Sequence, residues 1–311
     1  MTSYSPEGAL IKTQKNKEHL SSEAGIIRAM EQGIILEAPV AICDHELNLH
    51  LVLPCGIRGI IPKDEAVFSQ TGERTKDIAI LTRVGKTVCF KVTEVKNTAG
   101  IKTAYLSRRK AQEECYKNYA SKLIPGDVIS GSITHIESFG AFVDIGCGII
   151  SLLAIDAISV SRINHPSDRL SVGDSIFAVI RGHDELGRIN LSMRELLGTW
   201  SENAEMFCEG ETVSGIVRGV ESYGIFVELT PNLAGLAEYK ENVRSGQRTA
   251  VYIKSIIAEK MKIKLILIDT QDAPSEKIPI EYYINTQEIK HIERWTYSPE
   301  ASNRLVETIF N

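Results

Sequence analysis

Two pairs of aromatic residues stand out by type and spacing: Phe139 with Phe142 in FGAFVDIG, and Tyr223 with Phe226 in YGIFVEL. Both segments have the order aromatic, Gly, small or apolar, Phe, Val, acidic, and they lie 84 positions apart. Exposed aromatic rings on neighbouring positions of a sheet bind unpaired nucleic-acid bases by stacking. These residues therefore favour the capture of a single-stranded nucleic acid.

On a regular strand the two rings of each pair would point to opposite faces, because side chains alternate with a period of two. A glycine, Gly140 or Gly224, follows the first aromatic of each pair. A bulge or kink at a glycine shifts the alternation by one residue. We therefore expect both rings of each pair on one exposed sheet face. The alternative for Phe139 and Tyr223 is a place in the hydrophobic core.

The repeat extends well beyond the aromatic motif, so it marks a duplicated domain. PGDVISGSI (125–133) opens one copy and EGETVSGIV (209–217) opens the other. Each copy closes with a Gly turn and a strand pair, at 171–194 and at 244–268. Five short strands with Gly turns predict a small closed barrel of the OB type.

The middle of the chain, with PGDVISGSI, FGAFVDIG, VGD and GRINLS in that order, resembles the RNA-binding domain named after ribosomal protein S1. The later copy resembles it in a shortened form that lacks a counterpart of SRINHPSDRL (161–170). An earlier, degenerate copy shows GIRGIIPKDE, RVGKTVCFKV and TAYLSRRK in the family's order. The expected fold is mainly β, with three tandem five-stranded OB-fold barrels joined by helical connectors and flanked by N-terminal and C-terminal helices.

The expected organisation follows from these copies and from the composition between them. It comprises a polar N-terminal segment (1–23), a degenerate barrel with a leading helix (24–110), a helical linker (111–124), a barrel (125–194), a second helical linker (195–207), a shortened barrel (208–270) and a C-terminal extension (271–311).

The two ends of the chain carry separate expectations. Ser residues before AGIIRAMEQG predict a capped helix that stops at Gly33, and the first 20 residues are expected to be mobile. Ser298 and Pro299 predict the start of a final helix carrying Leu305, Val306, Ile309 and Phe310. We expect this apolar stripe to pack on the third barrel; the alternative is docking to a partner such as the ribosome.

For the middle barrel, the resemblance implies an RNA surface made of Phe139, Phe142, Asp184 and Arg188. The guanidinium of Arg188 can reach a phosphate or lie flat on a base. Asp184 can orient that guanidinium or accept a hydrogen bond from a base amino group. The family often has a histidine where this chain has Ala154, which weakens the prediction of base readout.

The other two copies offer weaker candidates. In the third copy Tyr223 and Phe226 form the platform, Lys262 stands nearest the family's arginine and Lys264 lies on the same strand face. A lysine acts on phosphate as a point charge and stacks poorly. In the first copy His50 occupies an aromatic position and can stack on a base, or it has no role beyond its strand.

The net charge of −5 is unusual for a protein that binds RNA. Residues 24–110 carry 13 basic and 9 acidic side chains, residues 123–195 carry 5 and 9, and residues 208–270 carry 8 of each. The barrel most similar to the family is thus the most acidic. We expect modest affinity per barrel, with stacking as the larger contribution and tandem copies raising the overall affinity.

Other classes of function lack sequence support. No phosphate-binding loop, nucleophile motif or HExxH is present, so neither catalytic residues nor a cofactor are expected. The spacing of CDHELNLH (43–50) and Cys55 argues against a zinc site. Six cysteines without a CxxC pair favour a reducing cytoplasm, and the lack of a long apolar run means that no membrane partner is expected. No small-molecule substrate is expected either.

These observations favour a non-enzymatic protein that binds single-stranded RNA. The resemblance implies mRNA as the ligand, a role in translation and the 30S ribosomal subunit as a partner. One alternative is an accessory factor in RNA decay or transcription. A second is a protein-interaction scaffold whose degenerate OB barrels have lost RNA binding.

Overall fold

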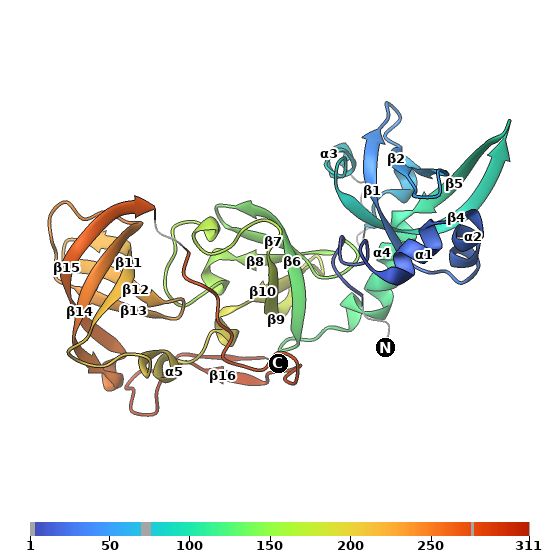
Figure 1. Ribbon diagram of the computed structural model, residues 1–311. Helices are drawn as coiled ribbons and strands as arrows, with labels where there is room; N and C mark the ends of the chain where they lie inside the picture. Colours follow the sequence, from blue (N-terminus) through green and yellow to red (C-terminus); the bar gives the residue numbers. More distant parts are fainter. Residues whose placement is uncertain (1–3, 70–75, 275–276, 311) are drawn as a thin grey trace. The chain divides into compact units, whose positions relative to one another are not determined.

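The computed structural model describes residues 4–69, 76–274 and 277–310 (Figure 1). Within these residues the chain forms three closed five-stranded barrels. In each barrel the first three strands pair in sequence order, and the fifth strand lies between the third and the fourth. The fifth strand runs parallel to the third, and the other pairings are antiparallel. The expected mainly β fold of tandem OB-type barrels is confirmed.

The strands follow the three copies that the sequence shows. The first barrel contains β1 (Leu36–Cys43), β2 (Leu49–Val52), β3 (Arg58–Ile61), β4 (Thr87–Thr98) and β5 (Ile101–Ser107). The second contains β6 (Val128–Glu137), β7 (Gly140–Asp144), β8 (Ile150–Ala154), β9 (Ser175–His183) and β10 (Ile189–Ser192). The third contains β11 (Thr212–Glu221), β12 (Gly224–Thr230), β13 (Leu233–Ala237), β14 (Gln247–Ile257) and β15 (Lys262–Pro274).

Short helices fill the connections. The α-helices are α1 (Gln14–Leu20), α2 (Glu23–Glu31), α3 (Asp77–Leu81), α4 (Arg108–Asn118) and α5 (Trp200–Ala204). The 3-10 turns are η1 (Lys63–Glu65), η2 (Ala120–Lys122), η3 (Ile155–Ala157), η4 (Pro166–Asp168), η5 (Arg194–Leu196) and η6 (Ala258–Lys260).

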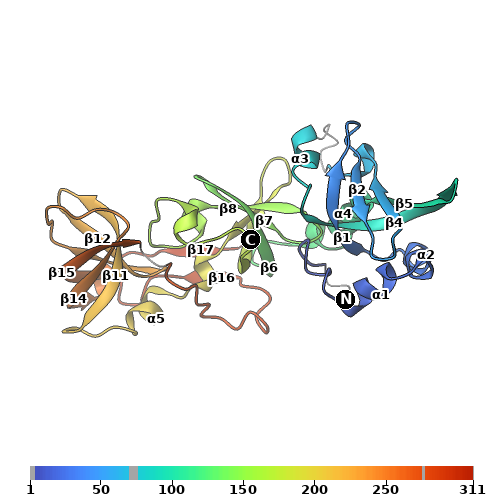
Figure 2. The same cartoon turned by 45° about the horizontal axis from the view of Figure 1, so that its top comes forward.

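The chain divides into two compact units. One contains residues up to Leu123 together with Asp144–Ile150 and Glu185–Gly187, and the other contains the rest. Figure 2 shows the same elements from a second direction. The first barrel has its own aliphatic core, and so has the third, whose core includes Trp200 and Trp295.

The helix α2 begins as expected. The side chain of Ser22 caps it by accepting a hydrogen bond from the amide of Gly25, and Gly33 beyond its end has a φ of +62°. Such a serine cap satisfies an amide that would otherwise lack a partner in the first turn.

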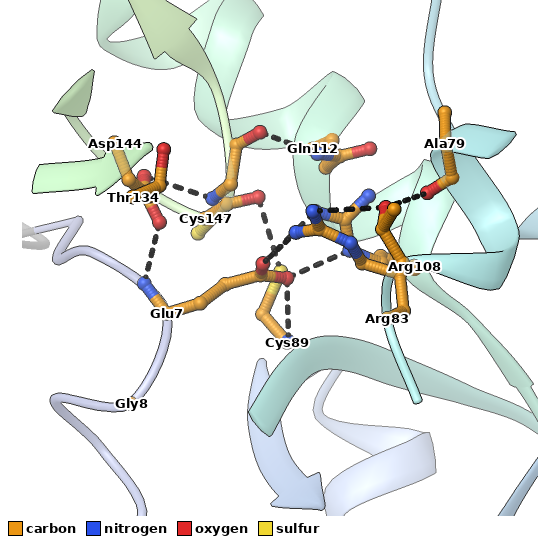
Figure 3. Close-up of polar contacts among 12 residues, drawn as sticks. Glu7, Gly8, Ala79, Arg83, Cys89, Arg108, Gln112, Thr134, Asp144 and Cys147 are labelled. Atoms are coloured by element: carbon orange, nitrogen blue, oxygen red, sulfur yellow. Dashed lines mark hydrogen bonds and ion pairs between the residues drawn. The ribbon is translucent and has the colours of Figure 1, made fainter. Parts of the chain in front are cut away.

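The expectation of a mobile N-terminal segment is wrong for the part that the structure describes. The carboxylate of Glu7 is buried, with its Oε1 2.7 Å from Nε of Arg108 and 3.0 Å from the amide nitrogen of Cys89 (Figure 3). Burial alone would raise the pKa of Glu7, but the Arg108 guanidinium and the Cys89 amide outweigh it and lower this pKa. The polar composition of the N-terminal segment could not show that Glu7 is the buried ion-pair partner of Arg108.

The expected C-terminal helix is also wrong. Residues Glu307–Ile309 form β17, which pairs with β16 (Arg294–Thr296) in a two-stranded antiparallel sheet. Ser298 organises a turn, because its hydroxyl donates to the carbonyl of Arg304 and accepts from the amide of Val306, both at 2.7 Å. Pairing with β16 thus overrides the local helix signal.

The apolar residues of this extension divide between several environments. Phe310 is buried against Val128 and Val179 of the middle barrel, whereas Val306 packs on the third barrel. Leu305 and Ile309 are exposed. The expected packing of one stripe on the third barrel therefore holds only for Val306.

Helical structure is extensive in the first linker and short in the second. The helix α4 begins at Arg108, inside the segment assigned to the first barrel, and ends at Asn118. In the second linker α5 is limited to five residues, capped by Thr199. Gly198, just before the cap of this helix, has a φ of +83° and so ends any helical structure there.

Candidate nucleic-acid interface

The aromatic pair of the middle barrel lies together on the surface. The ring centroids of Phe139 and Phe142 are 6.0 Å apart, with their planes at 90°. Phe139 is 54% exposed and Phe142 is half-buried. This exposure argues against the core alternative for Phe139, and two adjoining rings can hold successive bases.

The route by which the rings meet differs from the expected glycine bulge. Phe139 lies in the turn between β6 and β7, and Gly140 is the first residue of β7. A Cβ at Gly140 would lie 2.6 Å from the carbonyl oxygen of Leu153 on β8. The glycine therefore permits close approach of two strands, and Phe139 reaches its partner because it precedes the strand.

A histidine that the sequence did not single out extends this platform. His135 on β6 stacks on Phe142, with centroids 6.1 Å apart and planes at 23°. Its Nε2 lies 2.7 Å from a carboxylate oxygen of Glu137. His135 lies before the aromatic motif, on a neighbouring strand, so the motif alone could not identify it.

Asp184 and Arg188 are brought together in the hairpin between β9 and β10. The Arg188 Nε lies 2.7 Å from Asp184 Oδ2, and the Arg188 amide donates to Asp184 Oδ1 at 2.8 Å. The carboxylate thus orients the guanidinium and neutralises its charge. Arg188 is the more exposed of the two, so its planar group remains open to a ligand.

The third barrel repeats the aromatic arrangement. The rings of Tyr223 and Phe226 have centroids 6.1 Å apart and planes at 86°. Tyr223 is 68% exposed and Phe226 is 36% exposed. Tyr223 lies in the turn before β12, and a Cβ at Gly224 would lie 2.6 Å from the carbonyl oxygen of Ala237.

Strand pairing places a lysine beside this platform. Phe226 is the partner of Leu236, and Leu236 is in turn the partner of Lys264 on the parallel strand β15. Directly paired residues share one face of a sheet, so Phe226, Leu236 and Lys264 form one row. Lys262 lies two residues before Lys264 on the same face. For the ammonium groups of both lysines, the described part of the chain offers no ion pair.

The same pairing relates the middle barrel to the third. Asn190 of β10 is the partner of Leu152 on β8, as Lys264 is of Leu236. Counting two residues back along each strand makes Arg188 the counterpart of Lys262. This supports the match made from the sequence, where the third copy is too short to align directly.

In the first barrel His50 is engaged by a neighbour. Its Nε2 lies 2.7 Å from Oδ2 of Asp44, and this hydrogen bond, together with the amide of Asn48, lowers the pKa of Asp44. His50 is also in one row with Ile60 and Tyr105. Tyr105, which the sequence did not suggest, has the ammonium group of Lys96 5.1 Å from its ring centroid.

The acidic residue of the repeated motif has different contacts in the third barrel, where it is Glu228, and in the middle barrel, where it is Asp144. In the third barrel Glu228 is fully buried, with Arg169 Nη2 2.8 Å away and Arg218 bonded to its other oxygen. Arg169 comes from the 161–170 segment, which the third copy lacks. Burial lowers the pKa of Arg169, and the Glu228 charge opposes that shift. In the middle barrel Asp144 accepts from the backbone amides of Gly146 and Glu7.

The described residues, 4–69, 76–274 and 277–310, contain neither a metal-binding cluster nor a membrane-spanning helix. No group of three or more His, Cys, Asp or Glu side chains there is placed to hold a metal ion. No helix in that part of the chain has the length and apolar run needed to cross a membrane. The six cysteines are unpaired.

Comparison with known proteins identifies the central barrel. The S1 RNA binding domain model matches residues 122–194. The small ribosomal subunit protein bS1 of Rhizobium meliloti (strain 1021) is 33% identical over 187 residues, covering 54% of this chain and 33% of that protein. The bS1 of Leuconostoc lactis is 32% identical over 170 residues, covering 50% of this chain and 39% of that protein.

A longer alignment joins this chain to bS1 of Staphylococcus aureus (strain COL), which is 28% identical over 292 residues. That alignment covers 87% of this chain and 70% of the relative. By contrast, the chain spans only 39% of the bS1 of Leuconostoc lactis and 33% of the bS1 of Rhizobium meliloti. Residues 122–194 therefore match the S1 RNA binding domain, and 87% of the chain, which is built from three barrels of one topology, aligns with a bS1 protein at 28% identity.

Proposed function

We propose that this protein binds single-stranded RNA on the aromatic platforms of its middle and third barrels, and that its ligand is mRNA during translation. The observation that carries the proposal is the repeated pair of exposed, adjoining rings, Phe139 with Phe142 and Tyr223 with Phe226. Bases stack on the rings, while Arg188, Lys262 and Lys264 contact phosphates. The S1 family match and the bS1 relatives support the RNA ligand and the link to translation.

A binding assay with a fluorescent, unstructured RNA and the full chain tests RNA capture. Phe142→Ala combined with Phe226→Ala removes one ring from each platform, and stacking contributes about 1–3 kcal/mol per base. Tyr252→Ala is a matched control, because Tyr252 is as exposed as Phe226 but pairs with Thr212 and Ile266 outside its row. Absence of binding by the unaltered chain at low salt would leave a protein-interaction scaffold as the better reading.

Co-sedimentation in a sucrose gradient tests the role in translation. We expect the protein to travel with the 30S subunit and to be released by nuclease treatment of the mRNA. Co-purification with a nuclease or a polymerase, with no ribosomal fraction, would favour the accessory role in RNA decay or transcription. In that case RNA binding would stand and only the assignment to translation would fail.

A further inference from the structure

A pocket of about 670 Å³ opens beside Phe226, between the third barrel and the C-terminal extension. The barrel contributes Phe226, Leu236 and the turn between β14 and β15. The extension contributes Tyr297 and residues 302–304. Since Phe226 and Leu236 also belong to the row of the aromatic platform, the pocket adjoins the surface proposed to bind RNA.

The wall formed by the extension is anchored to the third barrel. The Tyr297 hydroxyl donates to the carbonyl of Asn232 at 2.6 Å, and the Asn303 amide donates to the carbonyl of Glu259 at 3.1 Å. Trp295 and Tyr297 pack in the core of the third barrel. The pocket is therefore part of the folded structure and needs no ligand to form, which limits the entropic cost of binding.

The charges around the pocket favour an anion. Lys260, Lys262 and Arg304 line it, and within the described residues their side chains have neither an ion pair nor a hydrogen bond. Glu259 is the one carboxylate among the lining residues. Cations without partners beside an opening attract phosphate, and an arginine adds a planar group that binds two phosphate oxygens at once.

The remaining lining favours a flat apolar ring. Phe226, Met261 and Ile263 contribute apolar surface. Asn303 is exposed at the opposite wall, where its side-chain amide can hydrogen-bond to the edge of a base. An apolar interior with a few polar groups is typical of small-molecule sites of this size. Together with the cations, it matches a nucleotide, which combines an aromatic base with a phosphate.

We propose that this pocket receives one unstacked nucleotide of the RNA strand bound on the third barrel. Its base lies against Phe226, and its phosphate is bound by Arg304 and Lys260. The C-terminal extension thereby becomes part of the RNA site in addition to its role in packing. This inference rests on the proposed RNA-binding function, because the strand must reach the pocket from the aromatic platform.

The test compares Arg304→Ala with Arg248→Ala in the full chain. Both arginines are exposed on the third-barrel side of the molecule, but Arg248 contacts Ser214 and does not line the pocket. With a fluorescent oligouridine as the probe, we expect Arg304→Ala to raise the Kd roughly tenfold, as for loss of a charged hydrogen bond. Arg248→Ala should change it by less than about twofold, in line with loss of a single exposed charge.

Photocrosslinking supplies an independent readout. An oligonucleotide containing 4-thiouridine is irradiated with the unaltered chain, and crosslinked peptides are mapped by mass spectrometry. We expect crosslinks in the segment from Tyr297 to Val306 as well as in β12. Both variants are first checked for an unchanged thermal unfolding midpoint.

The outcomes separate the two proposals. Binding by the unaltered chain, with equal Kd values for the two arginine variants and crosslinks outside the extension, would overturn the pocket and leave the platforms standing. No binding of any single-stranded RNA by the unaltered chain would overturn the proposed function and the pocket with it. Weaker RNA binding by Arg304→Ala than by Arg248→Ala, together with crosslinks in the extension, supports both the proposed function and the nucleotide pocket.

Discussion

The middle and third barrels hold their aromatic pairs in nearly the same geometry, with centroids 6.0 and 6.1 Å apart and planes close to perpendicular. The charges beside the rings differ. In the middle barrel the guanidinium of Arg188 is paired with Asp184, and His135 is paired with Glu137. In the third barrel the described residues provide no partner for Lys262 or Lys264. One scaffold therefore presents a charge-balanced platform and a cationic one.

The comparison also shows how one motif position can serve two purposes. Asp144 and Glu228 are 84 positions apart and occupy the acidic place of the repeat. The shorter Asp144 accepts hydrogen bonds from backbone amides, whereas the longer Glu228 reaches two buried arginines. Both copies of the motif therefore have an acidic residue at this position, but the neighbouring residues determine which groups that residue contacts.

The largest effect is expected for Glu228→Gln. The buried guanidinium of Arg169 would lose its ion-pair partner, and that of Arg218 would keep only Asp168, whose Oδ2 lies 3.6 Å from its Nη1. Removing a charge from such a buried cluster costs about 3–5 kcal/mol of the free energy of unfolding. The chain's two tryptophans, Trp200 and Trp295, both lie in the core of the third barrel. Urea unfolding followed by tryptophan fluorescence therefore reports on this barrel, and its midpoint should fall sharply.

Asp144→Asn is the matched variant in the middle barrel. Burial and the nearby Glu7 raise the pKa of Asp144 to about 6, so removing its charge costs less free energy than removing the charge of a fully ion-paired carboxylate. The unfolding midpoint measured by circular dichroism, which reports on the strands of every barrel, should fall less for Asp144→Asn than for Glu228→Gln. Equal losses for the two variants would contradict the division of roles between Asp144 and Glu228.

Single removal of one ring from each platform gives the next largest effect. Phe142→Ala and Phe226→Ala should each weaken RNA binding by about 1–3 kcal/mol, because each removes one stacking surface. We expect the larger loss for Phe226→Ala, since Phe226 also lines the proposed nucleotide pocket. Fluorescence anisotropy, with the same RNA and the same salt concentration for both variants, measures the two losses of affinity. A loss confined to Phe142→Ala would assign RNA binding to the middle barrel alone.

The salt dependence of RNA binding tests the difference in charge between the middle and third barrels. Replacing Lys262 and Lys264 together with alanine should reduce the slope of log K against log salt by about 2, roughly one per phosphate contact. Arg188→Ala should change the slope less, because Asp184 already balances that charge. Binding measured over a series of salt concentrations gives the slopes. An equal change for both variants would mean that Arg188 leaves Asp184 when RNA binds.

The smallest effect is expected in the first barrel. His50→Ala should change RNA affinity by less than about 1 kcal/mol, because its imidazole is bonded to Asp44 and no aromatic pair flanks it. Tyr105→Ala is the informative comparison, since Tyr105 shares the row of His50 and offers a larger ring. A loss on Tyr105→Ala as large as that on Phe142→Ala would make the first barrel a third RNA-binding platform.

Much of the interface could be predicted from the sequence, for physical reasons. The repeat indicates the strand order, and its spacing places an aromatic residue at the turn before a strand and another within that strand in both copies. The match of Lys262 to Arg188 also follows from strand position. His135 and Tyr105 were not predicted, because neither belongs to the repeated motif and each meets its neighbours through strand pairing: His135 on β6 stacks on Phe142 of β7, and Tyr105 lies on β5 in the row of His50.

The ends of the chain show the limit of local signals. Ser298 and Pro299 have the composition of a helix start, but β16 supplies strand partners and Ser298 stabilises a turn. Glu7 lies in a polar segment, yet a buried arginine 101 residues away holds it in place. Both outcomes depend on contacts between residues that are far apart in sequence.

By itself, the sequence determined the three barrels and the positions of the aromatic pairs in the middle and third barrels, because strand periodicity, glycine turns and repeated spacing act over a few residues. Only the tertiary structure decided which charges remain free, what Asp144 and Glu228 contact, and that the C-terminal extension forms the wall of a pocket beside Phe226. Those features depend on burial and on partners from separate parts of the chain, which local patterns do not encode.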